Sequence, residues 1–183
     1  MGWNSGALHR DLPGGPPPRV TTGPAVRIVT LAERPDLATV VAAWQTLAFP
    51  DEETAAAALA RVSSQVAAVG PEQVFVLLVG KEPAGTASLV HKDLPARPDL
   101  TPWLASVYVA PPHRGRGYAA SLVAAVEAAA RTAAIPTLWL FTASEKRLYA
   151  RLGWIEAGRE VDAGVCVTLM RRDLGNAEPL RSA

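Results

Sequence analysis

The segment from Trp103 to Arg131 constrains this chain most, because it predicts a strand, a loop and a helix in direct succession. The run from Val107 to Val109 is β-branched and aromatic, which favours a strand. Pro111 and Pro112 end that strand, since proline donates no hydrogen bond to a sheet. After the loop, the sequence is rich in alanine, with apolar residues at helical spacing, and it predicts a helix.

The loop between this strand and helix reads Arg114-Gly115-Arg116-Gly117. Glycine allows positive φ angles and lets the backbone approach a ligand closely. The first turn of a helix also leaves backbone N–H groups without partners, at the positive end of the helix dipole. With two arginines beside them, these groups predict a site for an anion such as phosphate.

Composition limits the other possibilities. A length of 183 residues and a hydrophobic fraction of 49% favour a single globular domain with a sizeable core. The net charge of +1 gives no reason to expect a nucleic acid or a membrane as partner. Three dispersed histidines indicate no metal site. The single cysteine, Cys166, excludes an internal disulfide and is expected to be buried in the core. With no apolar signal core and no spanning apolar run, we expect a cytoplasmic protein.

The chain divides into a Gly/Pro-rich tail at residues 1–25, a folded domain at 26–174 and a C-terminal tail at 175–183. We expect strands at residues 26–30, 73–79, 86–91, 103–109, 137–142, 154–156 and 165–170. We expect helices at about 33–49, 54–66, 121–131 and 144–152, with Leu47 on the apolar face of the first, Asp51 capping the second and Ser144 capping the fourth. The central strand–helix–strand unit implies at least one parallel strand pair.

Two sequence motifs narrow the interpretation. The pattern Arg/Gln-x-x-Gly-x-Gly/Ala is matched by Arg114, Gly117 and Ala119, directly after the central strand. About 30 residues further on, Leu148 to Trp154 read LYARLGW. From about Val26 to Leu174, the chain resembles the GCN5-related N-acetyltransferases, which carry both motifs in this order.

This resemblance implies an α/β (α+β) fold: a mixed, mostly antiparallel twisted sheet of about six to seven strands, a splayed parallel strand pair and about four helices. It implies direct transfer of an acetyl group, in a ternary complex without metal, from acetyl-CoA to a primary amine of a small molecule or peptide. The cofactor-binding residues that it implies are Val107, Tyr108, Val109, Arg114, Gly115, Arg116, Gly117, Tyr118, Ala119 and Ser144.

The resemblance also gives Tyr149 the role of protonating the departing coenzyme A thiolate. A phenol with an ordinary pKa of about 10 keeps its proton at neutral pH and can donate it. Packing of the fourth helix onto the sheet is the alternative role for this side chain.

One position departs from the family pattern. Many members carry a glutamate about eleven residues before the first motif, as the base that takes a proton from the amine, and Trp103 stands there. A water relay through His91 or Asp93 is one hypothesis, and deprotonation of the amine in bulk water is another.

Several alternatives stay open at this stage. Gly115, Gly117 and Ala120 also fit a relaxed dinucleotide-binding fingerprint, which lacks its acidic partner here. A non-catalytic acetyl-CoA-binding sensor or interaction module is the second alternative. The identity of the acceptor, the formation of a homodimer and the role of the N-terminal tail are undecided. The acidic residues 51–53 are either acceptor contacts or partners of a helix dipole. Trp103 and Trp139 either form the wall of an acceptor pocket or belong to the core.

Overall fold

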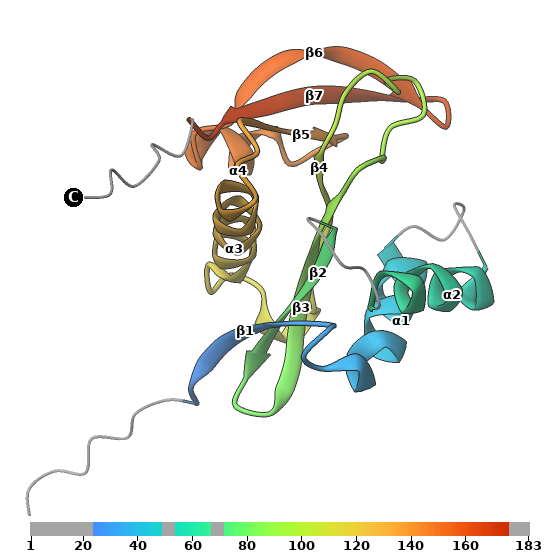
Figure 1. Ribbon diagram of the computed structural model, residues 1–183, viewed down its shortest axis with the longest axis vertical. Helices are drawn as coiled ribbons and strands as arrows, with labels where there is room; N and C mark the ends of the chain where they lie inside the picture. Colours follow the sequence, from blue (N-terminus) through green and yellow to red (C-terminus); the bar gives the residue numbers. More distant parts are fainter. Residues whose placement is uncertain (1–23, 49–53, 67–71, 176–183) are drawn as a thin grey trace, which may run out of the picture.

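The computed structural model describes residues 24–48, 54–66 and 72–175. Its strands are β1 (Val26–Thr30), β2 (Gln73–Val79), β3 (Glu82–Val90), β4 (Trp103–Val109), β5 (Thr137–Thr142), β6 (Ile155–Asp162) and β7 (Val165–Asp173). Its helices are α1 (Ala38–Ala48), α2 (Ala55–Val66), α3 (Tyr118–Thr132) and α4 (Lys146–Arg151), with short 3-10 turns at Pro35–Leu37 and Pro111–His113 (Figure 1). Among the described residues, no helix has the length and apolar character needed to cross a membrane.

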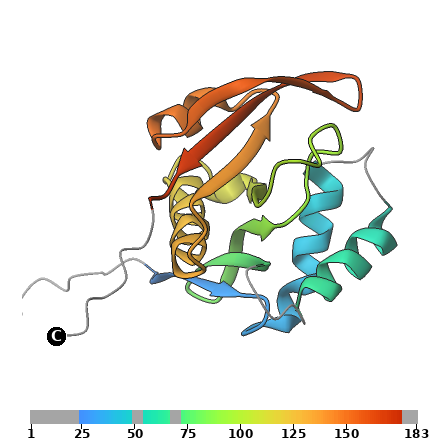
Figure 2. The same cartoon turned by 45° about the horizontal axis from the view of Figure 1, so that its top comes forward.

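The strands form one seven-stranded sheet in the order β1-β2-β3-β4-β5-β7-β6. Every neighbouring pair is antiparallel except β4 and β5, which are parallel. The predicted mixed sheet with one parallel pair and four helices is therefore confirmed. Figure 2 shows β5, β7 and β6 grouped at one end of the molecule, with α1 and α2 on the other side of β4.

Helices cover both faces of the sheet, and β2 shows how the sequence specifies this. Its residues alternate between two core clusters, one shared with α3 and the other with α1 and α2. Phe75, Leu77 and Val79 belong to the first cluster, and Val74, Val76 and Leu78 to the second. A strand buried on both faces must be apolar at every position, which accounts for the unbroken run VFVLLV.

The prediction that Leu47 lies on the apolar face of α1 was wrong, although Val41 and Trp44 of the same predicted face are buried. Leu47 is 73% exposed, whereas Gln45 is only 3% exposed. The buried face is centred on Val41, Ala42 and Gln45, and at about 100° per residue Leu47 projects from the opposite side. The helix therefore buries a polar side chain in preference to a leucine, and this side chain lines a cavity described below.

The predictions of a Ser144 cap on α4 and of a buried Cys166 are wrong, and the predicted Asp51 cap on α2 is not tested. Ser144 does not cap α4, because the residue before the helix is Glu145 and its backbone N–H donates to Thr142 Oγ1 (3.0 Å). Cys166 is exposed, because it lies beside the β6–β7 turn, opposite Val161, where the hairpin has left the core. Asp51 lies outside the described residues; at the start of α2, Thr54 Oγ1 accepts the Ala57 N–H (3.2 Å).

Candidate functional site

The parallel strands β4 and β5 touch at only one end. They share a single residue pair, Trp103 with Trp139, and the Trp139 N–H donates to the carbonyl of Pro102 (3.1 Å). Beyond this pair no further register between them is formed, so the second half of β4 has one edge without a partner strand among the described residues. An unpaired strand edge offers backbone hydrogen bonds to an extended ligand.

A bulge in β4 contributes to this separation. Tyr108 pairs with Thr86 and Ala105 with Ser88, so three steps along β4 match two steps along β3. The extra residue lies next to Ser106, whose φ of 52° is in the left-handed region. A bulge kinks and twists its strand, which here turns the end of β4 away from β5.

The backbone of Val109 faces the open edge. Ala110 donates its N–H to Ala84 on β3 (2.9 Å), and neighbouring residues of a strand point their polar groups to opposite sides. The Val109 carbonyl accepts a hydrogen bond from Nε of Arg114 (2.9 Å), whose guanidinium also lies over the Tyr108 ring at 5.8 Å. The Arg114 side chain therefore fastens the glycine loop to the end of β4, a role that the motif alone did not reveal.

The start of α3 has the features of an anion site. Gly115 and Gly117 have positive φ angles of 74° and 79°, and a Cβ at either would meet no protein atom within 4 Å. No side chain caps the helix. Its first backbone hydrogen bond, from Ser121 N–H to Gly117 C=O (3.2 Å), leaves the N–H groups at residues 118–120 without an intrahelical acceptor. A pyrophosphate fits these donors and this open space.

Arg114 was among the residues expected to bind the cofactor, but its backbone N–H is not available to do so. The N–H of Arg114 is already bonded to the Pro111 carbonyl (3.3 Å), so the available groups begin at Gly115. The exposed side chain of Arg116 remains beside them. Tyr118 is half-buried against the core on the α3 face. Ser144 is exposed after β5, and its hydroxyl lies 3.4 Å from a carboxylate oxygen of Glu145.

Tyr149 is held inside the core on the α3 face of the sheet. It is 8% exposed, and its ring meets the Trp154 ring edge-on with a centroid separation of 6.2 Å. Burial raises the pKa of Tyr149 to about 12, and the carboxylate of Glu145 adds to this increase. The hydroxyl forms no hydrogen bond within the described part of the chain, so no described group accepts its proton.

A buried carboxylate positions the LYARLGW segment. Glu127 on α3 accepts a hydrogen bond from Nε1 of Trp154 (3.0 Å) and pairs with Arg131 (3.1 Å) and more distantly with Arg172 (3.7 Å). Arg172 also donates to the Gly153 carbonyl (2.7 Å). This network was not predictable from the sequence, because its members come from α3, β7 and the turn after α4, far apart along the chain.

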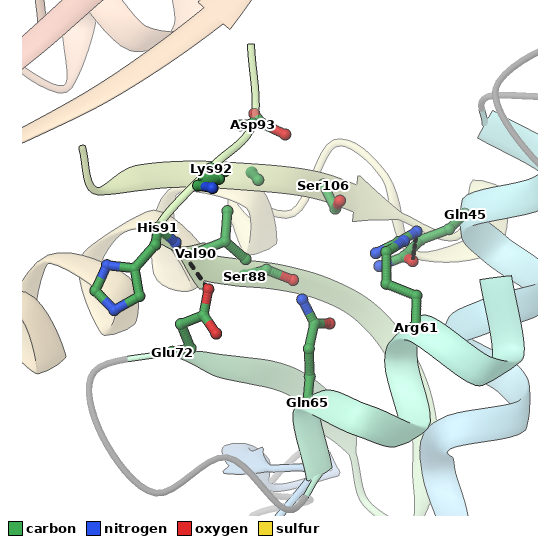
Figure 3. A pocket seen from close by; sticks show the side chains of 11 residues that line it. Gln45, Arg61, Gln65, Glu72, Ser88, Val90, His91, Lys92, Asp93 and Ser106 are labelled. Atoms are coloured by element: carbon green, nitrogen blue, oxygen red, sulfur yellow. Dashed lines mark hydrogen bonds between the residues drawn. The ribbon is translucent and has the colours of Figure 1, made fainter. Parts of the chain in front are cut away.

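A cavity of about 470 Å³ lies on the opposite face of the sheet, beside α1 and α2 (Figure 3). Its lining is mostly polar and consists of Gln45, Arg61, Gln65, Glu72, Ser88, Val90, His91, Lys92, Asp93, Ala105 and Ser106. Consecutive strand residues normally face opposite sides, yet Ala105 and Ser106 both reach this cavity because the bulge intervenes. We call it the Gln45 pocket.

Trp103, which stands where many family members have a glutamate, differs in its surroundings from His91 and Asp93, the two residues considered as replacements for that base. Trp103 is fully buried, and its indole N–H donates to the Leu100 carbonyl (2.9 Å), so it belongs to the core. Trp139 is half-buried against the same cluster. His91 and Asp93 both line the Gln45 pocket, although Figure 3 shows the His91 imidazole turned away from the end formed by Gln45.

Comparison with known proteins identifies the family. The profile of the acetyltransferase (GNAT) family matches residues 37–154, which include the loop at Arg114 and the LYARLGW segment. The chain belongs to the acetyltransferase (GNAT) family. A search of curated protein sequences gave no match.

Solved GNAT structures share this architecture. The structure of yncA from Salmonella typhimurium, solved with its cofactor acetyl-CoA, has a TM-score of 0.66 and 19% identity, covering 86% of this chain and 99% of that one. An N-acetyltransferase from Staphylococcus aureus has a TM-score of 0.65 and 19% identity, with coverage of 82% and 99%. A variant of spermidine N-acetyltransferase SpeG from Vibrio cholerae has a TM-score of 0.61 and 17% identity, with coverage of 81% and 94%. At these identities, the likeness concerns the fold.

Proposed function

We propose that this GNAT protein transfers an acetyl group from acetyl-CoA to the primary amine of a small molecule or peptide, directly and within a ternary complex. The observation that carries the proposal is the open edge of β4, which leads straight into a glycine loop and an uncapped helix with free N–H groups. The acetyl-CoA bound to yncA supports the choice of donor.

Under this proposal, the cofactor lies along one continuous surface. The N–H groups at residues 115–120 and the Arg116 side chain bind the pyrophosphate. The backbone of Val107 and the N–H of Val109, whose carbonyl is bonded to Arg114, pair with the amide groups of the pantetheine arm, as an added strand would. Arg114 acts indirectly, because its bond to the Val109 carbonyl holds the loop in place. When bound, acetyl-CoA supplies an activated thioester carbonyl.

The acceptor amine approaches from the other face, through the gap between β4 and β5. As its nitrogen bonds to the acetyl carbon, the carbon–sulfur bond breaks, and Tyr149 donates its proton to the departing sulfur. A buried phenol with a raised pKa is protonated throughout the neutral range and therefore carries the proton that the departing sulfur needs. Water beside His91 or Asp93 takes the proton lost by the amine, or the amine enters already neutral.

Two glycine variants test the donor site. Gly117→Ala and Gly164→Ala each force a non-glycine residue to a φ near 80°, and neither Cβ meets protein within 4 Å. Each is expected to lose roughly 1 kcal/mol of stability through backbone strain. Only Gly117→Ala, whose Cβ enters the proposed pyrophosphate site, is expected to weaken acetyl-CoA binding by about tenfold or more in a calorimetric titration. Equal affinities for the two variants would contradict the assignment.

A second candidate function is an acetyl-CoA-binding module without turnover. It is favoured by the buried Trp103 at the usual glutamate position, because tryptophan cannot accept a proton from the amine. Release of coenzyme A in the presence of a panel of amines separates the two. Binding of acetyl-CoA with no release above the hydrolysis background, across amino acids, diamines, amino sugars and peptides, would favour the module.

A further inference from the structure

The Gln45 pocket contains polar atoms that the protein itself leaves unsatisfied. Nε2 of Gln45, Oε1 of Gln65 and Oγ of Ser88 are buried and have no hydrogen-bond partner among the described residues. Gln45 is 3% exposed and Ser88 is 2% exposed. Unpaired buried polar atoms destabilise a fold, so these three atoms need a partner in the cavity, either ordered water or a polar ligand that displaces it.

The orientation of Gln45 defines one end of the pocket. Nη2 of Arg61 donates to Oε1 of Gln45 (2.7 Å), which fixes the amide so that Nε2 is the group left over. Figure 3 shows the two side chains reaching toward each other from α1 and α2. A guanidinium beside an unsatisfied amide N–H is a favourable arrangement for a carboxylate.

The remaining residues of the lining favour an amine, in contrast to the carboxylate favoured by Gln45 and Arg61. Oε1 of Gln65 is an unsatisfied acceptor, and Glu72 and Asp93 also line the cavity. Ser88 can accept or donate. The formal charges of Arg61 and Lys92 balance those of Glu72 and Asp93, so the pocket as a whole has no preference for a polycation.

We propose that the Gln45 pocket binds the acetyl acceptor, and that this acceptor is a small zwitterion, an amine that also carries a carboxylate, of amino-acid size. This inference rests on the proposed acetyl transfer. Ala105 and Ser106 join the pocket to the strand whose other end faces the cofactor loop, so an amine in the pocket lies against the strand that carries the donor site. A volume of about 470 Å³ suits a small molecule.

The test compares compounds that differ only in the carboxylate. Each L-α-amino acid is assayed beside its α-carboxamide, with putrescine and spermidine as polycations, by coenzyme A release and by calorimetric binding to the protein with and without coenzyme A. We expect one or more amino acids to be acetylated with kcat/KM at least about tenfold above their amides and above both polyamines.

Two pocket variants and one matched control sharpen this test. Gln45→Met keeps the volume but removes the donor, and it should raise KM for the amino acid about 10- to 100-fold while changing KM for the amide less than about threefold. Ser88→Ala removes an unsatisfied hydroxyl, so it should fold with an unchanged or higher Tm and still bind the amino acid several-fold more weakly. Ser63→Ala, an exposed change on α2, should alter neither value. All three should bind acetyl-CoA like the native protein.

Specific results would overturn the assignment. Acetylation of amides or polyamines as efficient as that of the amino acids would do so. An equal rise in KM for the amino acid and for its amide in Gln45→Met would do so as well. Either result leaves acetyl transfer itself intact. Conversely, amino-acid binding without any binding of acetyl-CoA would support the pocket and contradict the proposed function. Absence of binding or turnover for every amino acid would overturn the pocket assignment outright.

Discussion

Replacing Tyr149 with phenylalanine removes one hydroxyl group from the core and leaves the ring in place. The ring keeps its edge-on contact with Trp154, and the lost hydroxyl had no hydrogen-bond partner among the described residues. Burial of an unpaired hydroxyl costs roughly 1–3 kcal/mol, so the variant should be as stable as the native protein or more so at neutral pH. If Tyr149 donates the proton to sulfur, kcat should nevertheless fall roughly 100- to 10,000-fold.

The same substitution should alter how stability depends on pH. Burial raises the folded pKa to about 12, above the ordinary value of about 10 in the unfolded chain. The unfolded state therefore releases this proton first, and its contribution to stability, complete below pH 10, is lost as the pH rises through 12. At pH 11 the loss is about 1.4 kcal/mol, and its limit is about 2.7 kcal/mol.

Urea unfolding at pH 8 and pH 11 measures this difference. The native protein should lose about 1.4 kcal/mol more than Tyr149→Phe between the two pH values. Stopped assays of coenzyme A release on the same preparations give kcat. A variant that turns over at the full rate would refute the proton-donor role, whatever its stability. Equal pH dependence of the two proteins would refute the raised pKa.

Three other changes test the surroundings of the site. Gly85→Ala would place a Cβ 2.6 Å from the Tyr108 carbonyl, so β3 and β4 must separate, and a loss of roughly 1–3 kcal/mol should appear in Tm together with weaker acetyl-CoA binding. Trp154→Phe removes the hydrogen bond to Glu127 and should cost about 1.5–3 kcal/mol in urea unfolding; an unchanged midpoint would show that the bond is dispensable. Cys166, exposed in the folded state, should react with a thiol reagent before any unfolding, giving a burst of one equivalent that Cys166→Ala abolishes.

The strand, loop and helix of the proposed cofactor site could be predicted because their sequence signals are local. A strand, two prolines, a glycine loop and an alanine-rich helix follow one another within residues 103–131, and each is specified by its own residues. Positive φ at Gly115 and Gly117 and the uncapped start of α3 agree with that prediction. The side-chain role of Arg114 was not predictable, because it depends on where the Val109 carbonyl points.

The Gln45 pocket could not be predicted, because its lining residues come from five separate parts of the chain. Apolar spacing favoured Leu47 on the inner face of α1, and only the packed structure shows that Gln45 lies there instead. Likewise, nothing about a serine predicts positive φ at Ser106, since the bulge arises from the pairing of β4 with β3. The acidic residues 51–53, considered earlier as acceptor contacts, lie outside the described residues.

The bulge at Ser106 links the two halves of the site. Without it, Ala105 and Ser106 would face opposite sides of the sheet, and β4 would continue alongside β5. With it, both residues line the Gln45 pocket while the remainder of the strand turns its free edge toward the cofactor loop. A left-handed serine is costly, and a packed fold retains such a conformation only where its surroundings impose it. One strained residue therefore allows a single strand to border both the Gln45 pocket and the proposed cofactor site.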